Sequence, residues 1–298
     1  MTKKRINGVL LLNKEIGISS NAALQKVKWL YNAAKAGHTG TLDPMATGLL
    51  PICFGEATKF SSFLLNANKE YAALIKLGVT TDTYDATGKI ILINHVDFTD
   101  EVVKECIDSF IGVSNQIPPI YSALKVNGKA LYSYARTNQV VEIKPRKIEI
   151  FKLEIMEFLN ENIIKLRVLC SKGTYIRSLA HDIGQKLGCG ASLVGLKRIK
   201  TNNFILNEDI TIDYLKNLDD MEKQKLLLPI DTLVEHLEPF DLTHEQFHYV
   251  KNGHQFNVHK EDDIAGKLRL YYNKIFFGIA NRENGVIKPE RLVNTLLF

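Results

Sequence analysis

Residues 37–59, GHTGTLDPMATGLLPICFGEATK, contain the side chains of this chain best suited to chemistry. At the centre of this stretch Asp43 stands between Leu42 and Pro44, with glycines at 37, 40 and 48 around it. Proline disfavours helix for the residue before it, so we expect Asp43 in an extended loop. The glycines permit tight turns and the close approach of a ligand. A carboxylate presented in this way can be a nucleophile, a general base or a metal ligand. A helix N-cap is the structural alternative, because Asp before Pro is also a common helix start.

Composition favours a soluble cytoplasmic protein. The 298 residues are 45% hydrophobic and 24% charged, enough for one large domain or for a large and a small one. The first apolar run, residues 9–12, is too short for a signal peptide or a membrane span. The four cysteines show no C-x-x-C spacing and no nearby His pairing, which argues against a zinc site and a disulfide framework.

Basic charge is concentrated near the Asp43 loop. The first 38 residues contain seven Lys or Arg and one acidic residue, Glu15, whereas the last 62 contain eight of each sign. This distribution suits an anionic substrate at the loop. A solvated helix face is the alternative for several of these lysines.

The stretch around Asp43 closely resembles the signature of the TruB family of tRNA pseudouridine synthases. The resemblance implies that Asp43 is the catalytic nucleophile. It also implies that His38 fills the space left in the RNA loop when the target base flips out, although a neutral His between loops is the plain alternative. Further blocks extend the resemblance through essentially all of residues 7–205.

The stretch KEYAALIKLGVTTDTYDATG (69–88) resembles a second part of the family pattern. Residues 70–78 alternate like a strand, in which Tyr71 would ordinarily be a packing residue. The resemblance instead places Tyr71 over the target uracil. It also makes Asp85, otherwise a turn former, the carboxylate that shares the catalytic Arg.

The blocks QIPPIYSALKVNG (116–128) and CSKGTYIRSLAHDIG (170–184) complete the match. Tyr175 and Arg177 are two apart, so on a strand they would point to the same side. By resemblance Arg177 pairs with Asp43, Tyr175 lines the base pocket and Leu196 contacts the flipped uracil. The residues expected to contact the RNA backbone are Lys14, Lys125, Lys172, Lys197 and Arg198, with solvated faces as the alternative.

The pattern of elements predicts an α+β fold. We expect a pseudouridine synthase fold over residues 1–236, with a central, mostly antiparallel sheet flanked by helices, followed by a small β-barrel-like, PUA-type domain over 237–298. Periodicity predicts helices from Ser19–Ser20 to about residue 35, over 55–65 and over 178–187. Trp29 lies off the apolar stripe of the first helix, and we expect it to pack against the next layer, with an RNA-facing aromatic as the alternative.

The resemblance implies a stand-alone enzyme that isomerises the T-loop uridine at position 55 of tRNA. Such a reaction involves neither redox chemistry nor phosphoryl transfer, so we expect no cofactor and no metal. The expected partner is the tRNA T-arm, without a membrane or a protein partner, and the expected state is a monomer. Two alternatives stay open: an RNA-guided relative of the same family, and a non-catalytic tRNA-binding or RNA-folding protein. The sequence does not choose between attack of Asp43 at C1′, addition at C6 and a glycal route.

Overall fold

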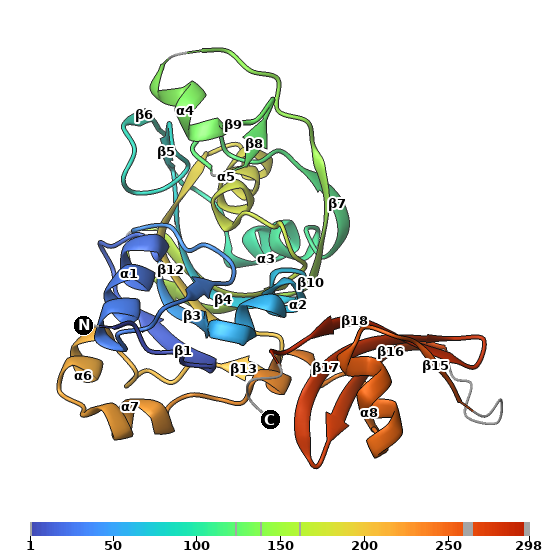
Figure 1. Cartoon of the computed structure of the whole chain (residues 1–298). Helices are drawn as coiled ribbons and strands as arrows, with labels where there is room; N and C mark the ends of the chain where they lie inside the picture. The colour runs from blue at the N-terminus through green and yellow to red at the C-terminus, as the bar shows by residue number, and fades with distance from the viewer. Residues whose placement is uncertain (1, 123, 138, 161, 259–264, 295–298) are drawn as a thin grey trace.

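The computed structural model describes residues 2–122, 124–137, 139–160, 162–258 and 265–294. Helices and strands are mixed along the chain as expected (Figure 1). The strands are β1 (Gly8–Lys14), β2 (Ala36–His38), β3 (Thr47–Phe54), β4 (Lys69–Leu77), β5 (Val79–Thr81), β6 (Ile90–Ile93), β7 (Gly112–Gln116), β8 (Lys125–Val126), β9 (Lys129–Ala130), β10 (Arg146–Leu159), β11 (Ile163–Cys170), β12 (Ala191–Thr201), β13 (Phe204–Ile205), β14 (Glu238–Asp241), β15 (Phe256–Asn257), β16 (Gly266–Tyr272), β17 (Ile275–Glu283) and β18 (Val286–Leu292). The helices are α1 (Ser20–Leu30), α2 (Ser61–Leu65), α3 (Asp100–Asp108), α4 (Leu131–Arg136), α5 (Ile176–Leu187), α6 (Ile212–Lys216), α7 (Asp220–Lys225) and α8 (His244–Lys251), with 3-10 turns η1 (Gly55–Lys59) and η2 (Ile230–Val234).

A nine-stranded sheet forms the body of the molecule. Its main path runs β1-β3-β12-β4-β11-β10-β7, with β2 added to β3 and β13 to β12. Every pair is antiparallel except β3 with β12. Strand β4 shows why the sequence forms this sheet: Ala73, Ile75 and Leu77 are buried, while the residues between them are partly exposed. This period of two is that of a strand with one side on a core. The predicted central, mostly antiparallel sheet is confirmed.

Helices cover the sheet and end where the sequence provides caps. Helix α5 packs on β12 and on α3, and α1 packs on α6 (Figure 1). The hydroxyl of Ser19 caps α1 by accepting a hydrogen bond from the Ala22 amide at 3.1 Å. Gly188, with φ +80°, ends α5 in the left-handed conformation that glycine adopts without cost. Among the described residues no helix is both long and apolar enough to cross a bilayer.

The last part of the chain forms a second, curled sheet of five strands, in the order β14-β16-β17-β18-β15 (Figure 1). This sheet shares a hydrophobic cluster with the body, in which Phe277 and Ile279 lie with Val9, Leu49 and Phe60. Truncating the second sheet would therefore expose apolar side chains of β1 and β3. The boundary at residues 236–237 stays a prediction. Within the predicted C-terminal domain, residues 259–264 and 295–298 lie outside the described parts.

Several local predictions are wrong. Helix α1 ends at Leu30 rather than near residue 35, because Asn32 takes a left-handed conformation and the following residues bond to the backbone of Lys4. The helix expected over 55–65 is a 3-10 turn followed by the short helix α2. Helix α8 was not predicted at all. Trp29 does not pack inside: it is 73% exposed at the end of α1.

The contact between β3 and β12 depends on Gly48. Its φ is +99°, and a Cβ atom there would lie 2.3 Å from the backbone oxygen of Arg198. We expect Gly48→Ala to lower the free energy of unfolding by at least about 2 kcal/mol, because clash adds to backbone strain. Urea unfolding followed by circular dichroism measures this loss.

Gly17→Ala is the matched control for this substitution. Gly17 also has a positive φ, +87°, but no atom lies within 4 Å of the added Cβ. Its cost is therefore strain alone, about 1 kcal/mol. Equal losses in the two variants would contradict the idea that close packing of β3 on β12 requires Gly48.

Candidate active site

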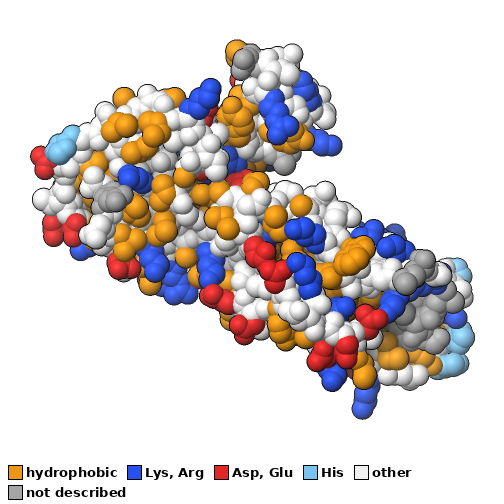
Figure 2. Space-filling view, turned by 90° about the vertical axis from the view of Figure 1, so that its left-hand side faces the viewer, with side chains coloured by type: hydrophobic (Ala, Val, Ile, Leu, Met, Phe, Trp, Pro, Cys, Tyr) orange, Lys and Arg blue, Asp and Glu red, His pale blue; other side chains and the backbone are white. Residues whose placement is uncertain are grey.

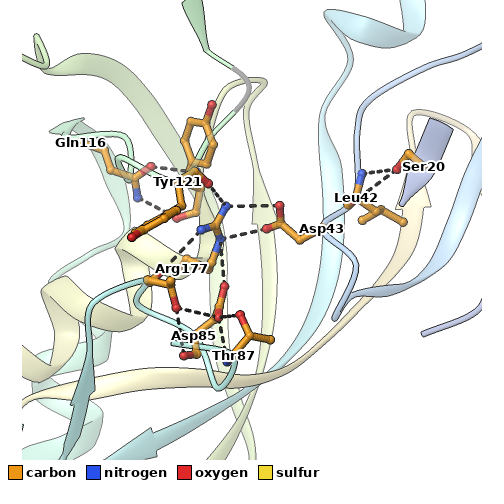
Figure 3. A network of polar contacts seen from close by, with 10 residues as sticks. Ser20, Leu42, Asp43, Asp85, Thr87, Gln116, Tyr121 and Arg177 are labelled. Carbon is orange, nitrogen blue, oxygen red and sulfur yellow. Dashed lines mark hydrogen bonds and ion pairs between the residues drawn. The ribbon is translucent and has the colours of Figure 1, made fainter. Parts of the chain in front are cut away.

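Asp43 lies in the loop between β2 and β3, and a buried serine fixes the backbone of this loop. The amide of Leu42 donates to the Ser20 hydroxyl at 2.8 Å, and this hydroxyl donates to the Leu42 carbonyl at 2.9 Å (Figure 3). After Asp43 the chain makes a short turn, in which the Ala46 amide donates to the Asp43 carbonyl, and enters β3. Asp43 therefore does not cap a helix. Its carboxylate is free to point at a partner.

That partner is Arg177, as predicted. Nε of Arg177 lies 2.9 Å from Oδ2 of Asp43, and Nη2 donates to Oδ1 at 3.2 Å, which makes a two-point ion pair (Figure 3). The arginine side chain is 5% exposed and the Asp43 side chain 36%. The expectation that Tyr175 and Arg177 lie on a strand is wrong. Tyr175 precedes α5 and Arg177 lies in its first turn, so the helix start aims the guanidinium at the loop.

Two further segments hold the guanidinium. Nη2 donates to the carbonyl of Tyr121 at 2.9 Å, and Nη1 donates to the carbonyl of Thr83 at 3.3 Å. Asp85 lies behind the arginine, with Oδ2 at 3.6 Å from Nε (Figure 3). The other oxygen of Asp85 accepts from Thr83 Oγ1 and from the amide and hydroxyl of Thr87. The arginine is therefore held between two carboxylates and two carbonyls from three separate segments.

The charge on Asp43 depends on this arrangement. Burial raises the pKa of the Asp43 carboxyl above its ordinary value, and the nearby charge of Asp85 raises it further. The guanidinium of Arg177 acts in the opposite direction, since it favours the ionised form. Lys14, more distant, also lowers this pKa. Without its cations the carboxyl would take up a proton much more readily.

A cavity of about 670 Å³ opens in front of the ion pair. The predicted pocket residues Tyr71, Tyr175 and Leu196 line this cavity together with Asp43 and Arg177. The opposite wall belongs to an arm formed by β8, β9 and α4. Figure 2 shows this arm as a lobe above the body, with a hollow between them and Lys and Arg side chains gathered on the lobe. The volume is in the range of pockets that enclose a small organic ligand.

Strand β4 holds Tyr71 in place, and the buried side-chain amide of Gln116 holds Tyr175. Tyr71 lies in β4 opposite Arg198 of β12, and burial raises the pKa of its phenol, so the hydroxyl stays protonated. The backbone amide of Tyr175 donates to Gln116 Oε1 at 2.8 Å, and Gln116 Nε2 donates to the Tyr175 carbonyl at 3.1 Å. Gln116 is 3% exposed and acts only on the backbone. These contacts fix the positions of both tyrosines in the pocket before any ligand enters.

His38 lies in β2, next to the Asp43 loop but not among the residues that line the cavity. Burial and the charge of Arg198 lower the pKa of its imidazole, so the ring is neutral at neutral pH. Its Nδ1 is buried without a hydrogen-bond partner in the described structure. The role of His38 toward RNA stays a prediction.

Two of the five expected phosphate contacts are wrong. Lys14 is buried, and its ammonium donates to the carbonyls of Glu15 and Ile18 at 2.8 Å; burial lowers its pKa to about 8. Arg198 is 1% exposed and donates to the carbonyls of Leu49 and Gly40. Both side chains tie loops to the sheet. Sequence alone does not distinguish a basic residue in this structural role from one that is exposed on the surface.

The other three expected contacts are accessible to different degrees. Lys125 and Lys172 are exposed, and Lys172 donates to Asn66 Oδ1 at 2.9 Å. Lys197 is partly exposed and ion-paired with Glu208 at 2.6 Å, which reduces the charge it offers to RNA. The contribution of these three to RNA binding stays a prediction.

Three site contributors were missed from sequence: the hydroxyl of Ser20 and the carbonyls of Thr83 and Tyr121. Backbone carbonyls have no sequence signature. The sequence placed Ser20 only at the expected start of the first helix, and the residue that caps this helix is its neighbour Ser19.

Comparison with known proteins agrees with this geometry. Residues 28–176 match the TruB family pseudouridylate synthase N-terminal domain, 177–235 match the tRNA pseudouridylate synthase B C-terminal domain, and 239–293 match the C-terminal domain of pseudouridine synthase II TruB. The chain is 46% identical to tRNA pseudouridine synthase B of Dechloromonas aromatica, over 97% of this chain and 96% of that protein. It is 45% identical to the protein of the same name from Actinobacillus pleuropneumoniae, over 97% and 96%.

Solved structures confirm the predicted fold. A chain of a Cbf5–Nop10–Gar1 complex superposes with a TM-score of 0.72 at 26% identity, covering 96% of this chain and 84% of that one. A chain of the archaeal box H/ACA Nop10–Cbf5 complex gives 0.71 at 23% identity, over 96% and 86%. The matches to the family domains span the sheet, the arm and the Asp43–Arg177 pair alike. The chain belongs to the TruB family of pseudouridylate synthases.

Proposed function

We propose that the chain converts the T-loop uridine at position 55 of tRNA to pseudouridine, with Asp43 as the nucleophile. Its relatives at 45–46% identity over nearly their whole length are tRNA pseudouridine synthases, which supports isomerisation of a uridine in tRNA. The position in tRNA and the roles of the residues go beyond those names.

One observation carries the proposal. Asp43 is the partly exposed member of an otherwise buried ion pair, and it faces a cavity whose lining includes Tyr71, Tyr175 and Leu196. A protein that only binds RNA gains little from burying an arginine between two carboxylates, since the cost of removing these charges from water can exceed the gain from pairing them. A carboxylate that must stay ionised and keep one direction requires such an arrangement.

The reaction breaks the N1–C1′ bond, turns the uracil and joins C5 to C1′, after which the C5 hydrogen leaves as a proton. An ionised Asp43 can add to the base at C6 or attack the sugar at C1′. Both routes need the same charge and direction, which Arg177 supplies. Tyr71 is neutral, because burial raises its pKa, so it offers the base an aromatic ring rather than a ready phenolate.

The target base must leave its stack before it can enter the cavity. Flipping costs a few kcal/mol, which contacts in the pocket offset. Tyr71 and Tyr175 supply ring faces and Leu196 an apolar edge. The exposed Lys125 on the arm and Lys172 on the body lie where phosphates of a loop in the cleft could reach them.

The RNA-guided alternative differs in how the target is chosen, not in the chemistry. Among the structural neighbours, the Cbf5 chains were solved in complexes with Nop10 and Gar1. We propose that the present chain instead works alone, as a cytoplasmic monomer that binds the T-arm directly, without a cofactor. A non-catalytic RNA-folding role could accompany this activity but does not explain the ion pair.

Asp43→Asn tests the nucleophile. The amide keeps the shape but cannot attack, so we expect turnover to fall by at least about a thousandfold. Affinity for RNA should change by less than about fivefold, since the pocket walls remain. Tritium release from C5-labelled uridine in a T-arm stem-loop measures the reaction, and filter binding measures affinity. Parallel loss of binding and turnover would contradict a purely chemical role.

Arg177→Lys tests the ion pair. A lysine keeps the charge but cannot make two contacts with Asp43 and one with each carbonyl, so we expect the single-turnover rate to fall about a hundredfold.

The same variant makes a prediction about pH. The rate rises with pH as Asp43 ionises, and Arg177 lowers the pKa of Asp43 against the effect of burial. Weakening this contact raises the pKa, so the acidic limb of the pH–rate profile should move to higher pH. A lower rate with an unmoved limb would mean that Arg177 acts on the substrate rather than on Asp43.

A further inference from the structure

Tyr84 adopts a left-handed backbone conformation in the loop that holds Arg177. Its φ is +63°, which non-glycine residues rarely adopt. The residues on either side of it both serve Arg177: the Thr83 carbonyl accepts from Nη1, and the Asp85 carboxylate lies 3.6 Å from Nε. A change in the backbone at Tyr84 would therefore move both contacts.

The ring of Tyr84 is stacked on His181 of α5. The ring centroids are 3.9 Å apart and the planes differ by 15°. His181 follows Arg177 by four residues, so the two side chains lie on the same face of the helix, one turn apart. The loop from Thr81 to Gly88 thus meets α5 at two points, one at Arg177 and one at His181.

The stack is an aromatic contact between neutral rings. Burial lowers the pKa of His181, and burial together with the nearby charge of Asp182 raises the pKa of Tyr84. At neutral pH neither ring is charged. Neither residue lines the cavity, so neither can touch the base.

The loop is also attached to β12, where Leu193 exchanges backbone hydrogen bonds with Tyr84 and Ala86. Those bonds hold the loop on the sheet, whereas the Tyr84–His181 stack joins it directly to the helix that carries Arg177.

We propose that the Tyr84–His181 stack is a positioning contact that fixes the loop on α5. The loop in turn places Thr83 and Asp85 so that they hold the guanidinium of Arg177 toward Asp43. This inference rests on the proposed function, in which Arg177 directs the nucleophile. Ordinary packing at the edge of the site is the competing explanation.

Four variants distinguish a positioning contact from ordinary packing. Tyr84→Gly removes the ring and also relieves the backbone strain, while Tyr84→Phe keeps the ring. His181→Ala removes the opposite ring in a residue that favours helix, while His181→Phe restores an aromatic face. Tyr272→Ala is the matched control, because Tyr272 forms a similar stack with Phe247, at 4.0 Å and 13°, in the C-terminal sheet.

The first readout is single-turnover tritium release at saturating enzyme. Tyr84→Gly and His181→Ala should lower the rate about ten- to a hundredfold, with RNA affinity unchanged within about threefold. Tyr84→Phe, His181→Phe and Tyr272→Ala should stay near the wild-type rate. Tyr84→Gly combined with His181→Ala should lose no more than the worse single variant, as expected for two halves of one contact.

The second readout does not need activity. Hydrogen exchange of peptides that cover residues 81–90 should be faster in Tyr84→Gly and His181→Ala, and unchanged in the two Phe variants and in the control. Unchanged exchange in Tyr84→Gly and His181→Ala would overturn the proposal, whether or not the protein has the proposed activity.

The activity measurements distinguish failure of the positioning role from failure of the proposed function. If Tyr84→Gly keeps the wild-type rate, the positioning role is wrong. If Tyr84→Phe loses as much rate as Tyr84→Gly, the hydroxyl rather than the stack matters, and the proposal is wrong in that form. Absence of release by wild type would count against the proposed function, while the exchange experiment would still decide the loop contact.

Discussion

The site depends on one buried cation, the guanidinium of Arg177. A charge that is removed from water must be paired and hydrogen-bonded, or it destabilises the fold. Here two carboxylates and two backbone carbonyls surround it, from the Asp43 loop, the loop before β6 and the segment that leads into the arm, while helix α5 carries the arginine itself. The arginine can sit in the core only if all four segments are in place. Correct folding of distant parts and correct orientation of the Asp43 carboxylate are therefore the same requirement.

Two further buried cations stabilise the same region from the other side. Arg198 donates to carbonyls on both sides of the Asp43 loop, at Gly40 and Leu49, and so ties that loop to β12. The ammonium of Lys14 is held by two carbonyls and lowers the pKa of Asp43 through space. The cluster of Asp43, Asp85, Arg177 and Lys14 pairs two negative with two positive charges.

How much the sequence predicts depends on what each residue contacts. Resemblance and alternation found the main sheet, the ion pair and the residues of the pocket, because strand period and long motifs are local in sequence. Lys14 and Arg198 were misassigned, since a basic residue that caps carbonyls looks the same in sequence as one that binds phosphate. The helical start at Ile176 was missed because Tyr175 and Arg177 also fit a strand spacing. Helix α8 has a capping box at Thr243, a signal present in the sequence and not used.

The arrangement also explains why we propose Asp43, rather than Asp85, as the carboxylate that reacts. Both contact Arg177, but Asp85 is 6% exposed and one of its oxygens accepts three hydrogen bonds, so its negative charge is already spread over fixed donors. Asp43 keeps a third of its side chain open to the cavity and has the arginine as its main stabilising partner. When a base fills the cavity and displaces water, attraction between Arg177 and Asp43 strengthens, because the local dielectric falls. In the proposed reaction, the approach of the substrate would therefore strengthen the ion pair at the moment when burial favours protonation of Asp43.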